Sequence, residues 1–150
     1  MRLRSFLLAL LPLALSACLG DSSTKTDYPL VPIESTTFAT PLGVNLAAST
    51  KTASGLYYRD ITVGTGTTIA AGQMLNVKYS GALANGSVFD AGTYSFTIPG
   101  SVIQGWNEGL LGMKVGGTRQ LIIPPSLGYG ANGRDQIPPN AVLVFTVQPQ

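Results

Sequence analysis

The 150-residue sequence has no histidine, a single cysteine and few charged residues, which make up 11% of the chain. Without histidine the chain lacks the commonest general base and the commonest metal ligand, so Ser-His-Asp and Cys-His hydrolases and most zinc sites are excluded. One cysteine cannot form an intrachain disulfide or a CxxC motif. Any chemistry must therefore depend on shape, apolar contact and a few polar groups, and we expect neither a metal nor a cofactor.

Charge of either sign is scarce and nearly balanced. Two of the nine basic residues, Arg2 and Arg4, lie in the N-terminal segment described next, and the others equal the seven acidic residues in number. The basic residues do not cluster along the sequence. This balance argues against nucleic acid as a partner and against electrostatic binding to a membrane surface.

The first 18 residues have the layout of an export signal. Two arginines precede an apolar run over residues 6–15, which is too short to span a bilayer as a stable helix. Residues 15–18 (LSAC) resemble a bacterial lipobox, in which cleavage precedes the cysteine. The resemblance implies a signal peptide over residues 1–17 and a lipid on Cys18 that anchors the chain in a membrane. The alternative is an ordinary secretory signal with a free cysteine nearby.

Residues 18–53 are rich in Ser, Thr and Pro and show no sustained helical or alternating pattern. We interpret this stretch as the lipidated cysteine followed by a flexible linker. Leu19 is not the aspartate that retains some bacterial lipoproteins at the inner membrane, which favours the outer membrane, facing the periplasm or the cell surface. The linker has no long heptad pattern that would pair two chains, so we expect a monomer.

From about residue 54 the pattern becomes that of a folded domain, which we place at residues 54–150. Residues 75–80 alternate apolar and polar side chains, as in a half-buried strand, and the Asn85-Gly86 pair predicts a tight turn. Residues 102–111 have the apolar spacing of a short helix. The order is several strands, one helix and two more strands, with a long Gly- and Pro-rich loop over residues 126–140. This order predicts an α+β fold in which a curved antiparallel sheet of five or six strands wraps around the helix.

Seven short segments of this domain resemble successive motifs of one enzyme family, the FKBP-type peptidyl-prolyl cis/trans isomerases. They are residues 77–81 (VKYSG), 86–90 (GSVFD), 102–110 (VIQGWNEGL), 113–117 (MKVGG), 123–130 (IPPSLGYG), 137–140 (IPPN) and 143–145 (LVF). Each segment is a weak signal, but the ordered set with this spacing is specific. The resemblance implies isomerisation of Xaa-Pro peptide bonds in unfolded or exported proteins and binding of macrolide inhibitors of the rapamycin type.

The resemblance also implies a substrate pocket with Trp106 as its floor. Asp90 would orient the Tyr79 hydroxyl and face the carbonyl carbon of the twisted amide, while the Tyr129 hydroxyl and the Ile103 backbone N–H would donate hydrogen bonds to substrate carbonyls. The residues implied to line the pocket are Tyr79, Phe89, Tyr94, Val102, Trp106, Ile137 and Phe145. Taken singly, the apolar members of this set would be core residues in almost any α+β domain, and Asp90 could be a turn-former. The joint pattern favours the pocket.

The sequence departs from the family pattern at two places. Only three residues separate Asp90 from Tyr94, and none of them is the arginine that pairs with the aspartate in the family. The loop before Ile137 is about one residue short, with Gln136 where an apolar residue is common. The missing arginine leaves an alternative function open, a non-catalytic module that binds proline-containing segments of an envelope partner. A factor displayed on the cell surface that acts on host proteins is a weaker alternative.

Overall fold

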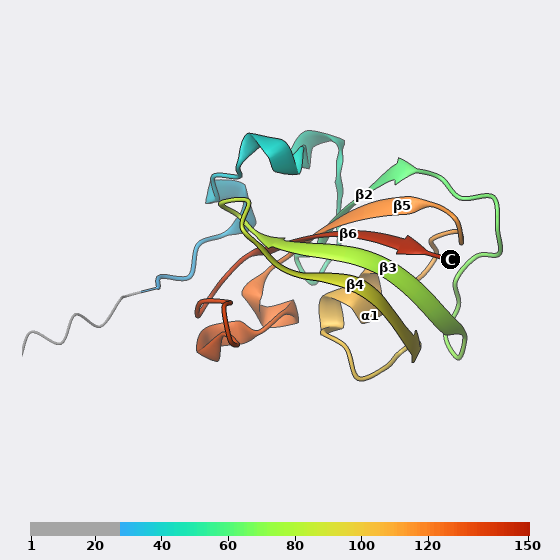
Figure 1. Cartoon of the computed structure of the whole chain (residues 1–150). Helices are drawn as coiled ribbons and strands as arrows, with labels where there is room; N and C mark the ends of the chain where they lie inside the picture. Colours follow the sequence, from blue (N-terminus) through green and yellow to red (C-terminus); the bar gives the residue numbers. More distant parts are fainter. Residues whose placement is uncertain (1–27) are drawn as a thin grey trace, which may run out of the picture.

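The computed structural model describes residues 28–150. Its six strands form one antiparallel sheet in the spatial order β1-β2-β5-β6-β3-β4. The strands are β1 (Thr50–Lys51), β2 (Tyr57–Thr62), β3 (Met74–Leu83), β4 (Val88–Thr97), β5 (Thr118–Ile123) and β6 (Leu143–Pro149). One short helix, α1 (Gln104–Gly109), lies against one face of this sheet (Figure 1). The α+β fold expected from the sequence is therefore confirmed.

The helix packs closely on the sheet because two glycines face it. A Cβ atom on Gly105 would lie 2.6 Å from Ile123 Cγ2, and one on Gly109 would lie 2.6 Å from Leu121 Cδ2. These two positions are four residues apart and so share one face of the helix. The main core, which includes Trp106 and Leu110, fills the space between α1 and the sheet.

Five short 3-10 helices lie in the connecting segments. They are η1 (Ile33–Ser35), η2 (Thr40–Leu42), η3 (Leu46–Ala48), η4 (Pro125–Leu127) and η5 (Gly130–Asn132). Of the last two, η4 begins one residue before the loop that the sequence predicts over residues 126–140, and η5 lies within that loop. In residues 28–150 no helix has the length and apolar character needed to cross a membrane.

The first three 3-10 helices belong to a segment, residues 33–51, that packs on the face of the sheet opposite to α1; we call it the N-terminal strap (Figure 1). Ile33 is buried there in a second apolar cluster with Tyr57, Ile122 and Val144. Phe38, Leu42, Val44 and Leu46 pack around this cluster. The last two residues of the strap form β1, which pairs with β2.

Hydrogen bonds from the strap to the sheet and to the turn between β3 and β4 hold this cover in place. The Ala39 N–H donates to the Ala84 carbonyl at 2.8 Å, and Gln120 Nε2 donates to the Leu42 carbonyl at 2.7 Å. Arg59 Nη2 donates to the Gly43 carbonyl at 2.8 Å. The prediction of a flexible linker over residues 18–53 is therefore wrong for residues 33–51, because their apolar side chains cover an apolar sheet face. Cys18 and the predicted signal peptide over residues 1–17 lie outside the described residues.

One carboxylate of the strap leads to a pH-dependence prediction. Glu34 Oε1 accepts hydrogen bonds from Lys51 Nζ at 2.5 Å and from the Tyr57 hydroxyl at 2.6 Å. The bond from Lys51 and then that from Tyr57 lower the pKa of Glu34 from 4.5 to about 2. A carboxylate with a depressed pKa stabilises the folded state above its unfolded pKa, and this contribution is lost as pH falls through the folded pKa.

We expect Glu34→Gln to lower the melting temperature at neutral pH. The difference between wild type and variant should shrink as pH falls from about 4.5 to about 2, the two ends of the pKa shift. Thermal unfolding followed by circular dichroism across this range measures the difference. A difference that stays constant down to pH 2 would contradict the proposed role of this carboxylate.

Candidate functional site

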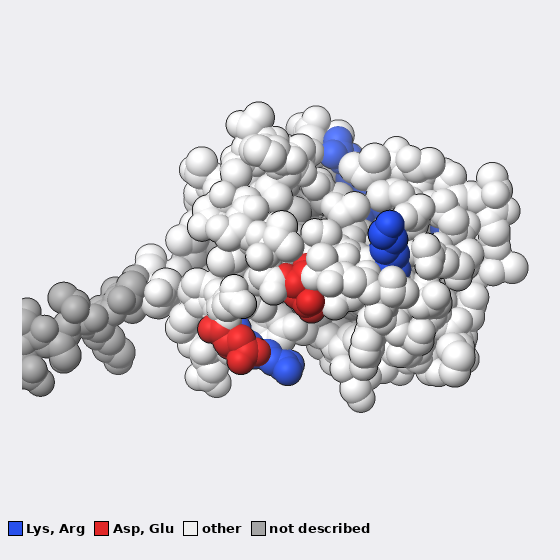
Figure 2. All heavy atoms as spheres, in the orientation of Figure 1, with Lys and Arg blue, Asp and Glu red and all other residues white. Residues whose placement is uncertain are grey.

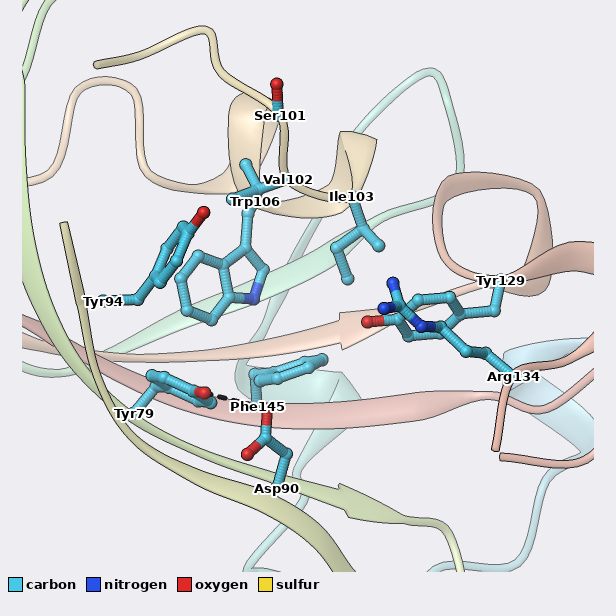
Figure 3. A pocket seen from close by; sticks show the side chains of 10 residues that line it. All are labelled: Tyr79, Asp90, Tyr94, Ser101, Val102, Ile103, Trp106, Tyr129, Arg134 and Phe145. Carbon is cyan, nitrogen blue, oxygen red and sulfur yellow. Dashed lines mark hydrogen bonds between the residues drawn. The ribbon is translucent and has the colours of Figure 1, made fainter. Parts of the chain in front are cut away.

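A cavity of about 460 Å³ opens between α1 and the sheet, with side chains from six separate segments in its lining (Figure 3). We call it the aromatic cavity. Its lining residues are Tyr79, Asp90, Tyr94, Ser101, Val102, Ile103, Trp106, Tyr129, Arg134 and Phe145. They come from β3, β4, the segment before α1, α1 itself, the loop after β5, and β6.

Trp106 is the buried centre of this lining. Its ring meets Tyr79 edge to face at a centroid distance of 5.1 Å and Phe145 at 5.4 Å, with interplanar angles of 77° and 86°. Phe96 supports it from the core at 6.0 Å. Edge-to-face packing of this kind fixes the orientation of each ring, so the cavity has rigid apolar walls.

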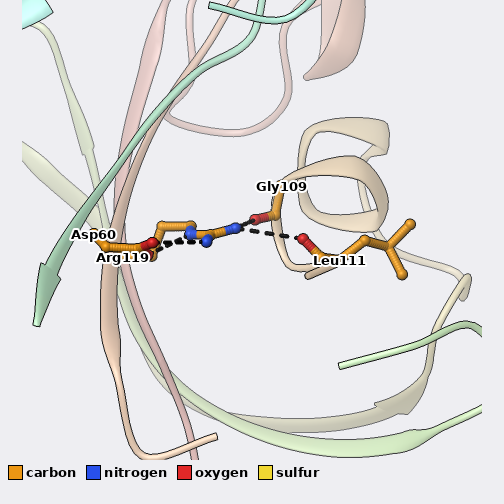
Figure 4. A network of polar contacts seen from close by, with 4 residues as sticks. All are labelled: Asp60, Gly109, Leu111 and Arg119. Carbon is orange, nitrogen blue, oxygen red and sulfur yellow. Dashed lines mark hydrogen bonds and ion pairs between the residues drawn. The ribbon is translucent and has the colours of Figure 1, made fainter. Parts of the chain in front are cut away.

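Two sets of contacts hold α1, and with it Trp106, at this place. Asn107, within α1, binds the segment that precedes the helix: its Oδ1 accepts from the Gly100 N–H at 2.8 Å, and its Nδ2 donates to the Gly100 carbonyl at 3.1 Å. After the helix, Arg119 Nη1 donates to the carbonyls of Gly109 and Leu111 at 2.8 and 3.4 Å (Figure 4). The same guanidinium is fixed by Asp60, through Nε at 2.6 Å and Nη2 at 2.9 Å.

A hydrogen bond links the two polar groups on the sheet side of the cavity. The Tyr79 hydroxyl donates to Asp90 Oδ2 at 2.8 Å. Burial, and then the hydrogen bond to Asp90, raise the pKa of Tyr79 to about 12. Tyr79 therefore remains protonated at any physiological pH and keeps the carboxylate of Asp90 in one orientation.

On the other side of the cavity, the Ile103 N–H and the Tyr129 hydroxyl have no acceptor within residues 28–150, and the buried Trp106 Nε1–H of the cavity floor has none there either. The Ile103 residue lies just before α1 in an extended conformation, and neither its backbone N–H nor the Tyr129 hydroxyl takes part in a hydrogen bond of the described chain. Both residues line the cavity. These donors can bind carbonyl oxygens of a peptide without breaking any bond of the fold.

The structure brings eight of the ten predicted site residues to the aromatic cavity. The other two, Phe89 and Ile137, line a second cavity of about 380 Å³, the side cavity, together with Asp90, Tyr129, Arg134, Asp135 and Gln136. The sequence reasoning missed Ser101 and Arg134, which line the aromatic cavity. Arg134 could have been found from its place, five residues after Tyr129 in the same loop, as a charged side chain among glycines and asparagine.

The missing arginine after Asp90 has a structural counterpart. Strand β4 runs without a break from Val88 to Thr97, and residues 91–93 pair with β3 as ordinary strand residues. In the part of the chain that the structure describes, Asp90 forms no ion pair, and its carboxylate is held by the Tyr79 hydroxyl. Asp90 is thus held by the Tyr79 hydroxyl, as the resemblance implies, and not by the arginine that is common in the family.

The family model described as FKBP-type peptidyl-prolyl cis-trans isomerase matches residues 65–149, which include every residue of the aromatic cavity. The chain belongs to this family. FK506-binding protein 4 of Chaetomium thermophilum is 44% identical over 103 residues, covering 65% of this chain and 21% of the relative. FK506-binding protein 4 of Dictyostelium discoideum is 46% identical over 100 residues, covering 63% and 28%. The chain thus spans about a quarter of the length of these curated relatives.

Solved FKBP structures share the fold. FkpA from Escherichia coli superposes with a TM-score of 0.64 at 37% identity, covering 68% of this chain and 50% of that chain. AtFKBP13 gives 0.63 at 36% identity, covering 67% and 95%. A peptidyl-prolyl cis-trans isomerase from Pseudomonas syringae gives 0.63 at 33% identity, covering 68% and 78%. The sheet and the helix of this chain therefore have the arrangement of an FKBP domain.

Proposed function

We propose that this FKBP-family chain isomerises Xaa-Pro peptide bonds of exported proteins while a lipid on Cys18 anchors it in the bacterial cell envelope. The observation that carries the catalytic part is the aromatic cavity, in which apolar aromatic walls stand next to unused hydrogen-bond donors, among them the Ile103 N–H and the Tyr129 hydroxyl, and an oriented carboxylate. A proline ring fits such walls, and the donors fit the carbonyls of the flanking chain. We propose Asp90, Tyr129 and Ile103 as the catalytic groups and the other predicted residues as substrate-binding groups.

The chemistry needs no nucleophile, base or metal. Rotation about a peptide bond breaks its resonance, against a barrier of roughly 18–20 kcal/mol, and a catalyst must bind the twisted amide better than either planar form. The twisted amide has less charge separation than the planar one, so transfer from water into an apolar cavity favours it. Walls formed by Trp106, Phe145 and Tyr79 provide that transfer, and the Ile103 N–H and Tyr129 hydroxyl hold the peptide on either side of the rotating bond.

We expect the chain from residue 19 onward, which keeps the strap, to accelerate cis-to-trans conversion of a Leu-Pro or Phe-Pro test peptide, with rapamycin as inhibitor. The physical reason is the preference of the cavity for the twisted amide. A protease-free assay that follows the conversion by fluorescence measures the rate. Binding of peptide and inhibitor without acceleration would overturn the isomerase and favour a docking module for proline-containing segments. This alternative is supported by the absence of an ion pair at Asp90 within residues 28–150.

The envelope location is supported by the LSAC motif at residues 15–18 and by the apolar run before it. We expect the full chain, expressed in a bacterium, to incorporate labelled palmitate and to be found with the membranes. Cys18→Ser should abolish the label, because the thiol is the attachment point, while leaving the isomerase domain folded. Equal labelling of both forms would contradict lipidation, and protease treatment of intact cells would separate periplasmic from surface display.

A further inference from the structure

Arg134 stands where the two cavities of this chain meet. Three residues line both the aromatic cavity and the side cavity: Asp90, Tyr129 and Arg134. Among the described residues, no other lysine or arginine lines either one. The molecule as a whole carries few charges, and on the face drawn in Figure 2 the charged side chains are few and scattered. A single cation at this junction is therefore a distinctive feature of the site.

The backbone of Arg134 is held firmly although its side chain is exposed. The Arg134 N–H donates to the Ile137 carbonyl at 2.9 Å, and the Ile137 N–H donates to the Arg134 carbonyl at 2.7 Å. This pair of bonds closes the loop between the two residues. The guanidinium carbon lies 5.8 Å from the centroid of the Tyr129 ring, within the range of a cation–π contact. The side chain thus extends over Tyr129 toward the centre of the residues that line the cavity (Figure 3).

Most of the hydrogen-bonding capacity of this guanidinium is unused. Nε lies 3.5 Å from Asp135 Oδ2, and the side chains of this pair are 68% and 86% exposed. Neither Nη group donates a hydrogen bond to a residue within 28–150. A guanidinium offers its donors in a planar fork that matches a carboxylate, so the free edge is suited to an acidic side chain.

The acidic groups near Arg134 sharpen this preference. Asp90 already accepts the Tyr79 hydroxyl, and Asp135 lies next to Nε. Both carboxylates would repel an acidic peptide if Arg134 were absent. Replacing Arg134 with a neutral residue should therefore turn a preference for acidic peptides into a preference against them, and not only weaken it.

We infer that Arg134 makes this domain selective for proline segments in which an aspartate or glutamate is adjacent to the proline. The inference rests on the proposed function, because it places the proline in the aromatic cavity and a neighbouring residue of the peptide beside Tyr129 and the exposed Arg134 side chain, which line the same cavity. The acidic side chain of the neighbouring residue then pairs with the free edge of the guanidinium. A lysine at the same place of the peptide is disfavoured by the same charge.

The test compares isosteric peptides that differ in charge alone, Glu-Pro against Gln-Pro and Pro-Glu against Pro-Gln. For the chain from residue 19 onward, we expect kcat/KM to favour glutamate in at least one pair by about three- to tenfold at low salt. The ratio should fall toward one as salt is added. In Arg134→Gln the ratio should drop to one or below. The ratio within each variant cancels any general loss of activity.

Lys114→Gln is the matched control, because it removes one exposed positive charge outside both cavities and should leave the ratio as in wild type. A wild-type ratio of one or less in both pairs, or the same ratio in Arg134→Gln, would overturn the inference. Absence of turnover with every peptide, Leu-Pro included, would overturn the proposed function instead. In that case the role of Arg134 would be tested by binding, measured by the fluorescence of Trp106, the chain's single tryptophan. Tighter binding of the glutamate peptide that is lost in Arg134→Gln would support the inference, and equal binding of the glutamate and glutamine peptides would overturn it.

Discussion

Asp60→Ala is expected to lower the free energy of unfolding by about 2–4 kcal/mol. The change strands the guanidinium of Arg119, whose side chain is only 6% exposed, without its bidentate carboxylate. A buried charge that loses its partner keeps its full desolvation cost, because water cannot replace the partner. We place the loss below the upper end of the usual range because the side chain of Asp60 is 33% exposed, so some water reaches the pair.

The double variant Asp60→Ala, Arg119→Met distinguishes a stranded charge from simple loss of packing. Methionine has a similar apolar stem but no charge, so the double variant should be more stable than Asp60→Ala alone. Urea unfolding of wild type, both single variants and the double variant gives the four free energies. A double variant that is less stable than Asp60→Ala would contradict the mechanism. Lys51→Met, which breaks the exposed pair with Glu34, should cost far less in the same assay.

The Arg119 network also shows what the sequence could not indicate. Residue 119 lies in β5, the first of the two strands that the sequence predicts after the helix. Strand alternation does not show that a charged side chain in this strand points inward and binds the last carbonyls of a helix. That arrangement depends on where α1 ends relative to the sheet, and this depends on tertiary packing.

The strap was missed although the strands carry a signal for it. Most of β5 and β6 is buried without the alternation seen in β3, which runs from Met74 to Leu83. Ile122 and Val144 face away from α1 into the second apolar cluster. A strand that is apolar on both faces must be covered on both faces. The segment that covers this second face of the sheet lies outside the FKBP motifs. It is the strap, whose apolar residues over 33–46 pack there.

The site was largely predictable because its residues lie in short motifs of fixed local geometry. Val102, Ile103 and Trp106 belong to one segment around α1, and their place relative to one another follows from the turn of the chain into the helix. Arg134 and Ser101 lie outside the residues that the motifs assign to the pocket. Their place at the cavity depends on loop conformation, which short motifs do not determine.

Asp90→Asn is expected to lower kcat/KM for a Leu-Pro peptide by about 10- to 100-fold, the effect of losing one charged hydrogen-bonding group from a transition state. The substitution keeps the size of the side chain and an oxygen that can accept the Tyr79 hydroxyl, but it removes the negative charge. Asp90 is exposed at the cavity, so the melting temperature should stay close to that of wild type. An unchanged rate would show that the carboxylate does not act on the twisted amide.

Tyr79→Phe tests whether Asp90 acts in the orientation that the structure gives it. The hydroxyl lies 2.8 Å from Asp90 Oδ2, and its pKa of about 12 means that it donates this bond throughout the pH range of the assay. If the role of the hydroxyl is to orient Asp90, its loss should reduce kcat/KM by about three- to tenfold in wild type and much less in Asp90→Asn. Additive losses would mean instead that the two groups contact the substrate independently. Because residues 91–93 contain no arginine to pair with Asp90, a coupled result would make Tyr79 the side chain on which the orientation of the carboxylate depends.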